Sequence, residues 1–137
     1  MHIIHCITVE QQNGNTATQY NMLVTRFEDL EMWKLAREIV KDIYSDFYHI
    51  KDFEYRNQIT SAGISIMNNI SEGFSRESKK EFHQFLNIAK GSTGEVKNMY
   101  YIGEDQNYIE SILAELRRER CEKEKNMIAK FMKHLKQ

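Results

Sequence analysis

The chain has 137 residues, of which 41% are hydrophobic, which suits one domain with a continuous core. Its 19 Lys and Arg side chains nearly balance 20 Asp and Glu, so the formal net charge of -1 gives the whole molecule no attraction to nucleic acid or to an acidic membrane. Its 2 cysteines fit neither a disulfide framework nor a zinc motif, which favours a cytoplasmic location, and the absence of proline favours long helices.

The N-terminal segment, residues 1–25, lacks a sustained hydrophobic period and contains the polar stretch QQNGNTATQYN. We therefore expect a disordered or poorly ordered arm, and Met22 is an alternative start that would leave most of it outside the protein. His2, His5 and Cys6 are too few to hold a metal without a further ligand, so we predict no metal site. Since no apolar run reaches about 18 residues and no signal peptide is recognisable, we expect neither a membrane span nor export.

A first helical pattern begins at Leu30, where apolar residues recur every three or four positions as far as Ile50. Met32, Leu35 and Ile39 lie beside this stripe and make the apolar face wider than one core requires. We therefore expect these three side chains to contact another copy of the chain.

A second helix is predicted from Tyr55 to Gly73, where glycine accepts the left-handed conformation that terminates helices. Ser78 and Glu81 then form a Ser-x-x-Glu capping box in front of the apolar run of a third helix. The acid, serine and glycine content of this region is therefore explained by helix ends rather than by a reaction centre.

The third helix continues through Gly91, where glycine costs about 1 kcal/mol relative to alanine, so we expect a neighbouring helix to approach closely there. After the turn GEDQNY, a fourth helix runs from Ile109 to Leu135 with the polar centre RRERCEKEK, which either lies in solvent or meets a charged partner. Four such segments with short links predict an all-α fold, an antiparallel up-down four-helix bundle over residues 26–137.

Two segments, residues 27–40 and 61–96, carry a family resemblance; they read FEDLEMWKLAREIV and SAGISIMNNISEGFSRESKKEFHQFLNIAKGSTGEV. They resemble the bacterial four-helix bundle family of proteins encoded by intervening sequences of 23S ribosomal RNA genes, with Avd, the accessory protein of diversity-generating retroelements, as a relative. The resemblance implies a homopentameric ring and no catalytic residue. For Avd it implies a basic surface that binds nucleic acid and a reverse transcriptase. The matching positions are Asn69, Glu72, Gly73, Glu81, Phe82, Phe85, Leu86, Gly91, Ser92 and Glu95.

No nucleophile with a base, carboxylate pair in a pocket or metal constellation is recognisable, and His83 is the only histidine of the matching segments. We therefore predict a non-enzymatic, oligomeric binding or scaffold module without a cofactor. Its expected partners are its own copies and either RNA or a nucleic-acid-processing protein. The alternatives are an accessory protein that binds a reverse transcriptase and a protein-only scaffold.

Cations gather towards the C-terminus, where residues 117–137 hold eight Lys and Arg against three Glu. Such an excess favours weak, sequence-independent binding of nucleic acid, because each phosphate that a cation neutralises releases counterions. The predicted nucleic-acid-binding residues are Arg76, Lys79, Lys80, Arg117, Arg118, Arg120, Lys123 and Lys125.

Overall fold

A computed structural model describes residues 5–13 and 16–136. A two-stranded sheet comes first, then a short 3-10 helix and four long helices, which confirms the predicted four-helix fold. The elements are β1 (His5–Asn13), β2 (Thr16–Val24), η1 (Phe27–Asp29), α1 (Glu31–Phe47), α2 (Phe53–Phe74), α3 (Lys79–Asp105) and α4 (Ser111–Leu135).

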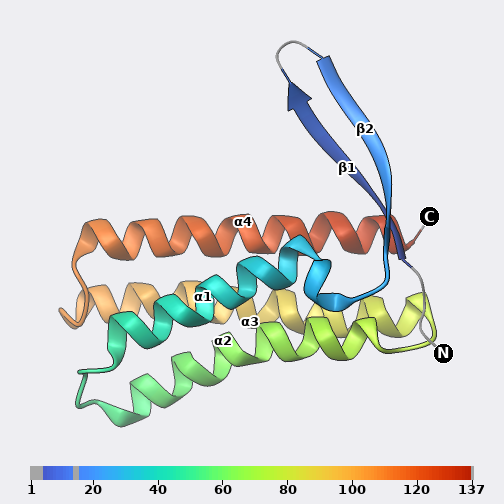
Figure 1. The fold of residues 1–137 in the computed structure, drawn as a ribbon. Helices are drawn as coiled ribbons and strands as arrows, with labels where there is room; N and C mark the ends of the chain where they lie inside the picture. Colours follow the sequence, from blue (N-terminus) through green and yellow to red (C-terminus); the bar gives the residue numbers. More distant parts are fainter. Residues whose placement is uncertain (1–4, 14–15, 137) are drawn as a thin grey trace.

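Consecutive helices run in opposite directions and pack in chain order, with α1 also against α4 (Figure 1). The ion pairs between α1 and α4 show this direction in detail. Asp46, near the end of α1, contacts Arg117 near the start of α4. Asp42, one turn earlier on α1, contacts Arg120, later on α4. These pairs show that α1 and α4 are antiparallel. Because α3 and α4 are also antiparallel neighbours, the end of α4 lies beside the beginning of α3.

The sheet corrects the prediction of a disordered N-terminal arm for residues 5–13 and 16–24, whereas residues 1–4 and 14–15 lie outside the described residues. β1 and β2 pair in antiparallel register, with His5 opposite Val24 and Asn13 opposite Thr16, and the hairpin projects away from the bundle (Figure 1). The sequence carries a hairpin signal here, because the dipeptide Gly-Asn separates two runs that contain β-branched residues, such as Ile7 and Val9 in the first and Thr16 and Thr18 in the second. Overall polarity is the wrong guide here, since turn residues and β-branched residues favour a hairpin even within a polar segment.

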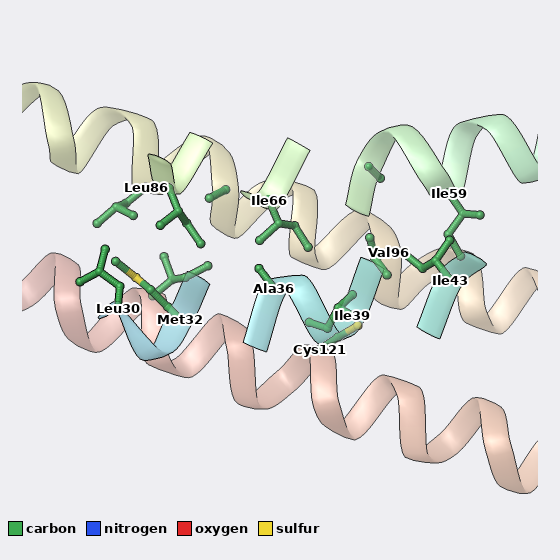
Figure 2. Close-up of a cluster of buried hydrophobic side chains, with 14 of the residues drawn as sticks. Leu30, Met32, Ala36, Ile39, Ile43, Ile59, Ile66, Leu86, Val96 and Cys121 are labelled. Atoms are coloured by element: carbon green, nitrogen blue, oxygen red, sulfur yellow. The ribbon is translucent and has the colours of Figure 1, made fainter. Parts of the chain in front are cut away.

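The core lies between the four helices and is built from apolar side chains of each of them (Figure 2). On α2 the fully buried positions Ile59, Ile66 and Ile70 keep the predicted helical spacing. Burying each such side chain contributes about 1.5–3 kcal/mol. Ala36 on α1 and Ala89 on α3 are also fully buried, and their small side chains allow neighbouring helices to approach closely.

The predicted intermolecular contact on α1 is wrong for two of its three residues. Met32 and Ile39 point into the interior (Figure 2), and only 3% and 2% of their surfaces are exposed. Leu35 is half-buried and packs against the same core. The buried face of α1 is turned by about one residue from the predicted stripe, because Trp33 and Val40 lie at its edges and are only half-buried. The apparent excess of apolar surface is therefore used within the chain.

Two glycines have roles different from those predicted. Gly73 lies inside α2, and the C-cap residue Ser75 is right-handed with φ -75°. A Cβ on Gly73 would lie 2.8 Å from Phe85 Cβ and 2.9 Å from Phe82 Cδ1, so glycine is needed there for helix packing. Gly91, predicted to allow such packing, is exposed, and apart from its two neighbours and the backbone of its own helix no atom of the described chain lies within 4 Å of a Cβ built on it.

The ends of α3 are defined by local hydrogen bonds. Ser78 Oγ accepts a bond of 3.1 Å from the backbone N–H of Glu81, which confirms Ser78 as the N-cap, and the Glu81 carboxylate accepts from the Ser78 hydroxyl at 3.3 Å instead of from its backbone N–H as in a full capping box. At the other end Asn107 has the left-handed φ of 59°, which asparagine tolerates. The N–H of Tyr108 then donates to Gly103 O at 2.8 Å and turns the chain into α4.

Candidate nucleic-acid interface

Arg117, at the centre of the predicted basic surface, is held inside the bundle. Its Nε and Nη2 donate to Asp46 Oδ2 and Oδ1 at 2.8 and 3.0 Å, and its Nη1 lies 3.4 Å from Asp42 Oδ1. Tyr100 completes the cluster by donating its hydroxyl to Asp46 Oδ2 at 2.9 Å. This hydrogen bonding raises the pKa of Arg117. The guanidinium is therefore used to join α1 and α4 and is not available to a phosphate.

The other two arginines of α4 are also paired with carboxylates. Arg120 Nη1 donates to Asp42 Oδ2 at 2.5 Å, and this arginine opposes the burial that raises the pKa of Asp42. Arg118 Nη1 donates to Glu104 Oε2 at 3.1 Å and its guanidinium lies 4.0 Å from the ring centroid of Tyr101. Both contacts reduce the positive potential that α4 presents to solvent.

Arg76 and Lys125 make ion pairs at the surface. Arg76 Nη2 lies 2.5 Å from Glu72 Oε1, and its guanidinium stacks 4.9 Å from the ring centroid of Phe85. Lys125 Nζ lies 3.3 Å from Glu122 Oε1. Of the eight predicted residues, five thus face an acid within the chain, and the predicted set does not form one basic surface.

The remaining three lysines, Lys79, Lys80 and Lys123, are exposed and make no ion pair in the described part of the chain. Lys123 lines a shallow groove along α4 together with Glu119 and Glu122, whose carboxylates disfavour an anion there. Lys79 and Lys80 instead lie at the start of α3, about 40 residues before Lys123 in the sequence. Of the eight predicted residues, these two lysines are therefore the ones that remain available to bind a nucleic acid.

Lys79 and Lys80 line a hollow of about 380 Å³ between the first turn of α3 and the end of α4, which we call the basic hollow. The other residues that line the hollow are not among the nucleic-acid-binding residues predicted from the sequence. The predicted antiparallel topology nevertheless places the end of the fourth helix beside the start of the third. Its lining residues are Lys79, Lys80, His83, Gln84, Leu135 and Lys136.

Glu124, in the polar centre of α4, is fully buried rather than solvated or bound to a partner protein. Neither carboxylate oxygen has a hydrogen-bond partner among the described residues. Burial raises its pKa to about 8, and burial also raises the pKa of the neighbouring Cys121 thiol to about 12. An acid without a base or a substrate pocket beside it does not form a catalytic pair, and a neutral thiol is a poor nucleophile.

Most of the family-type positions have structural roles. Phe82 and Leu86 are fully buried, and Ser92 Oγ lies 2.8 Å from Ser65 Oγ across α2 and α3. Asn69 Nδ2 donates to Ser65 O at 2.8 Å. Gly91 and Glu95 differ from the others, since both are exposed on α3 and make no specific contact in the described chain. The structure of one copy therefore does not explain these two residues.

The described residues contain no group of three or more His, Cys, Asp or Glu side chains that could hold a metal ion. The predicted absence of a metal at His2 falls outside the described residues. Of the helices described, none combines the length and apolar character that crossing a membrane requires.

The sequence profile of the 23S rRNA-intervening sequence protein family matches residues 28–130. The chain belongs to this family. The match includes all four helices of the bundle except the last turns of α4, and it begins after the hairpin. The family resemblance seen in the sequence is therefore confirmed.

A solved structure of another protein supports the fold. It is a protein of unknown function from the S23 ribosomal protein family of Bacteroides thetaiotaomicron, 20% identical, with a TM-score of 0.69. The similarity covers 74% of the present chain and 95% of that one. At this identity the likeness extends to the helical fold alone. No curated protein matches the chain.

Proposed function

We propose that this member of the 23S rRNA-intervening sequence protein family is a non-enzymatic, homo-oligomeric binding module of the cytoplasm that holds RNA weakly at its basic hollow. One observation carries the proposal. The arginines predicted to bind nucleic acid face carboxylates of the same chain, whereas Lys79, Lys80 and Lys136 share a hollow and make no ion pair with a described residue. Free cations at one end favour a polyanion there.

The expected affinity is low and insensitive to sequence. Among the described residues, the hollow has no Phe, Tyr or Trp in its lining and His83 is its one ring, so phosphate contacts supply most of the binding free energy. If about three phosphates are engaged, the affinity for single-stranded RNA falls about 20-fold between about 50 and 200 mM salt, because each contact contributes about 0.7 to the logarithmic slope. A ring of copies would repeat the hollow and add avidity.

Fluorescence anisotropy with single-stranded and structured RNA tests this proposal. We expect binding at about 50 mM salt that weakens with the slope given above and differs little between sequences. Binding that is undetectable at about 50 mM salt would refute the RNA function and leave the protein-only scaffold. Strong preference for one sequence would contradict a site that binds RNA mainly through the phosphate contacts of its lysines.

The homo-oligomer is proposed to form through the outer face of α3 around Gly91 and Gly94. Both glycines are exposed with open space around them, although glycine within a helix costs about 1 kcal/mol relative to alanine. Ile88, one turn before Gly91, is 52% exposed. The approach of a second copy would offset this cost, since small residues allow helices to pack closely. A pentameric ring closes such contacts without forming fibres.

Substitution Gly91→Lys tests this face without disturbing the fold. We expect helix stability to rise by about 1 kcal/mol, because lysine is a better helix former than glycine. Light scattering after size exclusion should then show a monomer of 16.3 kDa where the wild type shows about five times that mass. Asn126→Lys, at an exposed position on α4, is the control and should stay oligomeric. A monomeric wild type would end the oligomer proposal, and an unchanged variant would exclude this face.

A second candidate function, binding a protein such as a reverse transcriptase, is favoured by the end of the bundle opposite the basic hollow. Ile112 and Leu116, four residues apart at the start of α4, are 78% and 53% exposed. Tyr48, in the link between α1 and α2, and Phe53, the first residue of α2, are also exposed, and this link lies at the same end of the bundle. Exposed apolar residues that gather in one region are typical of protein-binding surfaces. This candidate predicts that Ile112→Glu abolishes capture of the partner and leaves RNA affinity unchanged.

A further inference from the structure

The basic hollow carries an arrangement of charge that does not stabilise the free protein. Lys79 and Lys80 occupy the first turn of α3, where the helix dipole disfavours cations. Lys136, the C-cap residue of α4, is favoured by the dipole of its own helix but adds a third positive charge to the same hollow. In the described chain no carboxylate lies within 4.0 Å of these three ammonium groups. An anion from outside would relieve their mutual repulsion.

The hollow also supplies hydrogen-bond donors. The first backbone N–H groups of a helix have no acceptor within it, and Ser78 caps only that of Glu81. His83 and Gln84 add a ring N–H and an amide to the lining, and Leu135 is the only apolar lining residue. Cations and N–H donors around a small volume suit an oxyanion and offer little to a base or an apolar ligand.

We propose that the basic hollow binds a phosphate group and prefers a terminal phosphate monoester to the diester of an RNA backbone. This inference rests on the proposed RNA function and names the group that the site recognises. A monoester carries a charge of about -1.5 to -2 at pH 7 and three free oxygens. An internucleotide diester carries one charge and two free oxygens, so it engages the three lysines less completely. Inorganic phosphate shares the same chemistry and serves as the minimal probe.

Lysine footprinting tests the site on the whole protein in any oligomeric state. The acetylation rates of Lys79, Lys80 and Lys136 are measured by mass spectrometry with inorganic phosphate, with 5′-phosphorylated RNA and with 5′-hydroxyl RNA of the same sequence. Lys51 and Lys130 are internal controls, because both are exposed and neither makes an ion pair with a described residue. We expect the three lysines of the hollow to be protected, most strongly by 5′-phosphorylated RNA, while the controls stay reactive.

Two variants complete the test. Lys80→Gln/Lys136→Gln should weaken the binding of 5′-phosphorylated RNA about tenfold and lower its logarithmic salt slope by about 1.4, the contribution of two contacts to a single strand. Lys51→Gln/Lys130→Gln removes the same amount of positive charge elsewhere on the surface. It should not weaken the binding of 5′-phosphorylated RNA or lower its salt slope by more than the contribution of about one phosphate contact.

Each outcome separates this inference from the proposed function. Protection by inorganic phosphate without RNA binding would support the phosphate site and refute the RNA function. RNA binding that the Lys80→Gln/Lys136→Gln variant does not weaken would overturn the phosphate site and leave the RNA function standing. Equal protection by 5′-phosphorylated and 5′-hydroxyl RNA would overturn the preference for a terminal phosphate.

Discussion

Replacing Glu124 by methionine should stabilise the protein by about 3 kcal/mol at pH 7, which corresponds to an increase in Tm of about 5–15 °C for a chain of this size. Glu124 is fully buried and neither of its oxygens has a hydrogen-bond partner among the described residues. Methionine has a similar length, no charge and no polar group that must be satisfied. The substitution therefore removes a desolvation penalty and keeps the packing.

The sign of the pH dependence follows from the raised pKa of Glu124. Burial raises it to about 8 from an ordinary value of 4.5. Below pH of about 4.5 the carboxyl is neutral in both states, so it costs no stability through ionisation. Between about 4.5 and 8 only the unfolded state ionises, and the wild type loses up to about 1.4 kcal/mol per pH unit. Above about 8 both states ionise and the loss reaches its full value.

Other charges near this part of the core do not neutralise Glu124. Burial is the one cause of its raised pKa. Asp42 of α1, Lys97 of α3 and Arg120 of α4 act on the neighbouring Cys121, but each of the three is already paired with another side chain. The penalty of burying Glu124 is therefore not offset by a cation.

Urea unfolding at pH 5 to 9 measures this effect. The wild type should lose stability relative to Glu124→Met as the pH rises, with most of the difference developed by pH of about 8. Glu119→Met, which replaces an exposed glutamate on the same helix, is the control and should change stability by less than about 0.5 kcal/mol. Parallel pH profiles for the wild type and Glu124→Met would show that Glu124 is not neutral in the fold.

Replacing Arg117 by alanine should destabilise the protein by about 3–5 kcal/mol, because it leaves a buried acid without its partner. The side chains of Arg117 and Asp46 are only 18% and 4% exposed, and two hydrogen bonds join them. Asp42 loses one of its two arginine contacts in the same variant. This result would assign Arg117 to the bundle and not to the nucleic-acid surface.

Lys125→Ala is the matched control for this prediction. Like Arg117, Lys125 lies on α4 and pairs with a carboxylate, that of Glu122, but both side chains of this pair are exposed. An exposed pair of this kind contributes less than about 1 kcal/mol, so its loss should hardly change the urea midpoint. Arg117→Ala, measured where it is still folded, should bind RNA as the wild type does. A stable Arg117→Ala protein with reduced RNA affinity would restore the role predicted from the sequence.

The helices were predictable because each carries a strong periodic pattern and the chain has clear signals at its helix ends. Ser78 and Glu81 are an example, since a capping box depends on residues three positions apart. The rotation of α1 was not predictable to the same accuracy. Met32 and Trp33 are adjacent and both apolar, so the choice of the buried one depends on how α1 lies against its neighbours.

The candidate site was only partly predictable, because a sequence count of cations does not show which of them meet an acid. Arg117 and Asp46 are separated by 71 positions and Arg120 and Asp42 by 78, so their pairing depends on the packing of α1 against α4. Lys136 was missed for the same reason, since it reaches the hollow only through the return of α4 to the start of α3. Local signals located Lys79 and Lys80 but not their neighbours.

Sedimentation velocity with a fluorescent 5′-phosphorylated RNA tests the central claim most directly, because it reports assembly and RNA binding in one experiment. We predict that at about 50 mM salt the RNA sediments with an oligomer of the 16.3 kDa chain. At several hundred millimolar salt the RNA should be released while the oligomer persists, since the ring contacts are not made by phosphates. RNA that sediments alone at about 50 mM salt, beside a folded monomer, would contradict both parts of the proposed function.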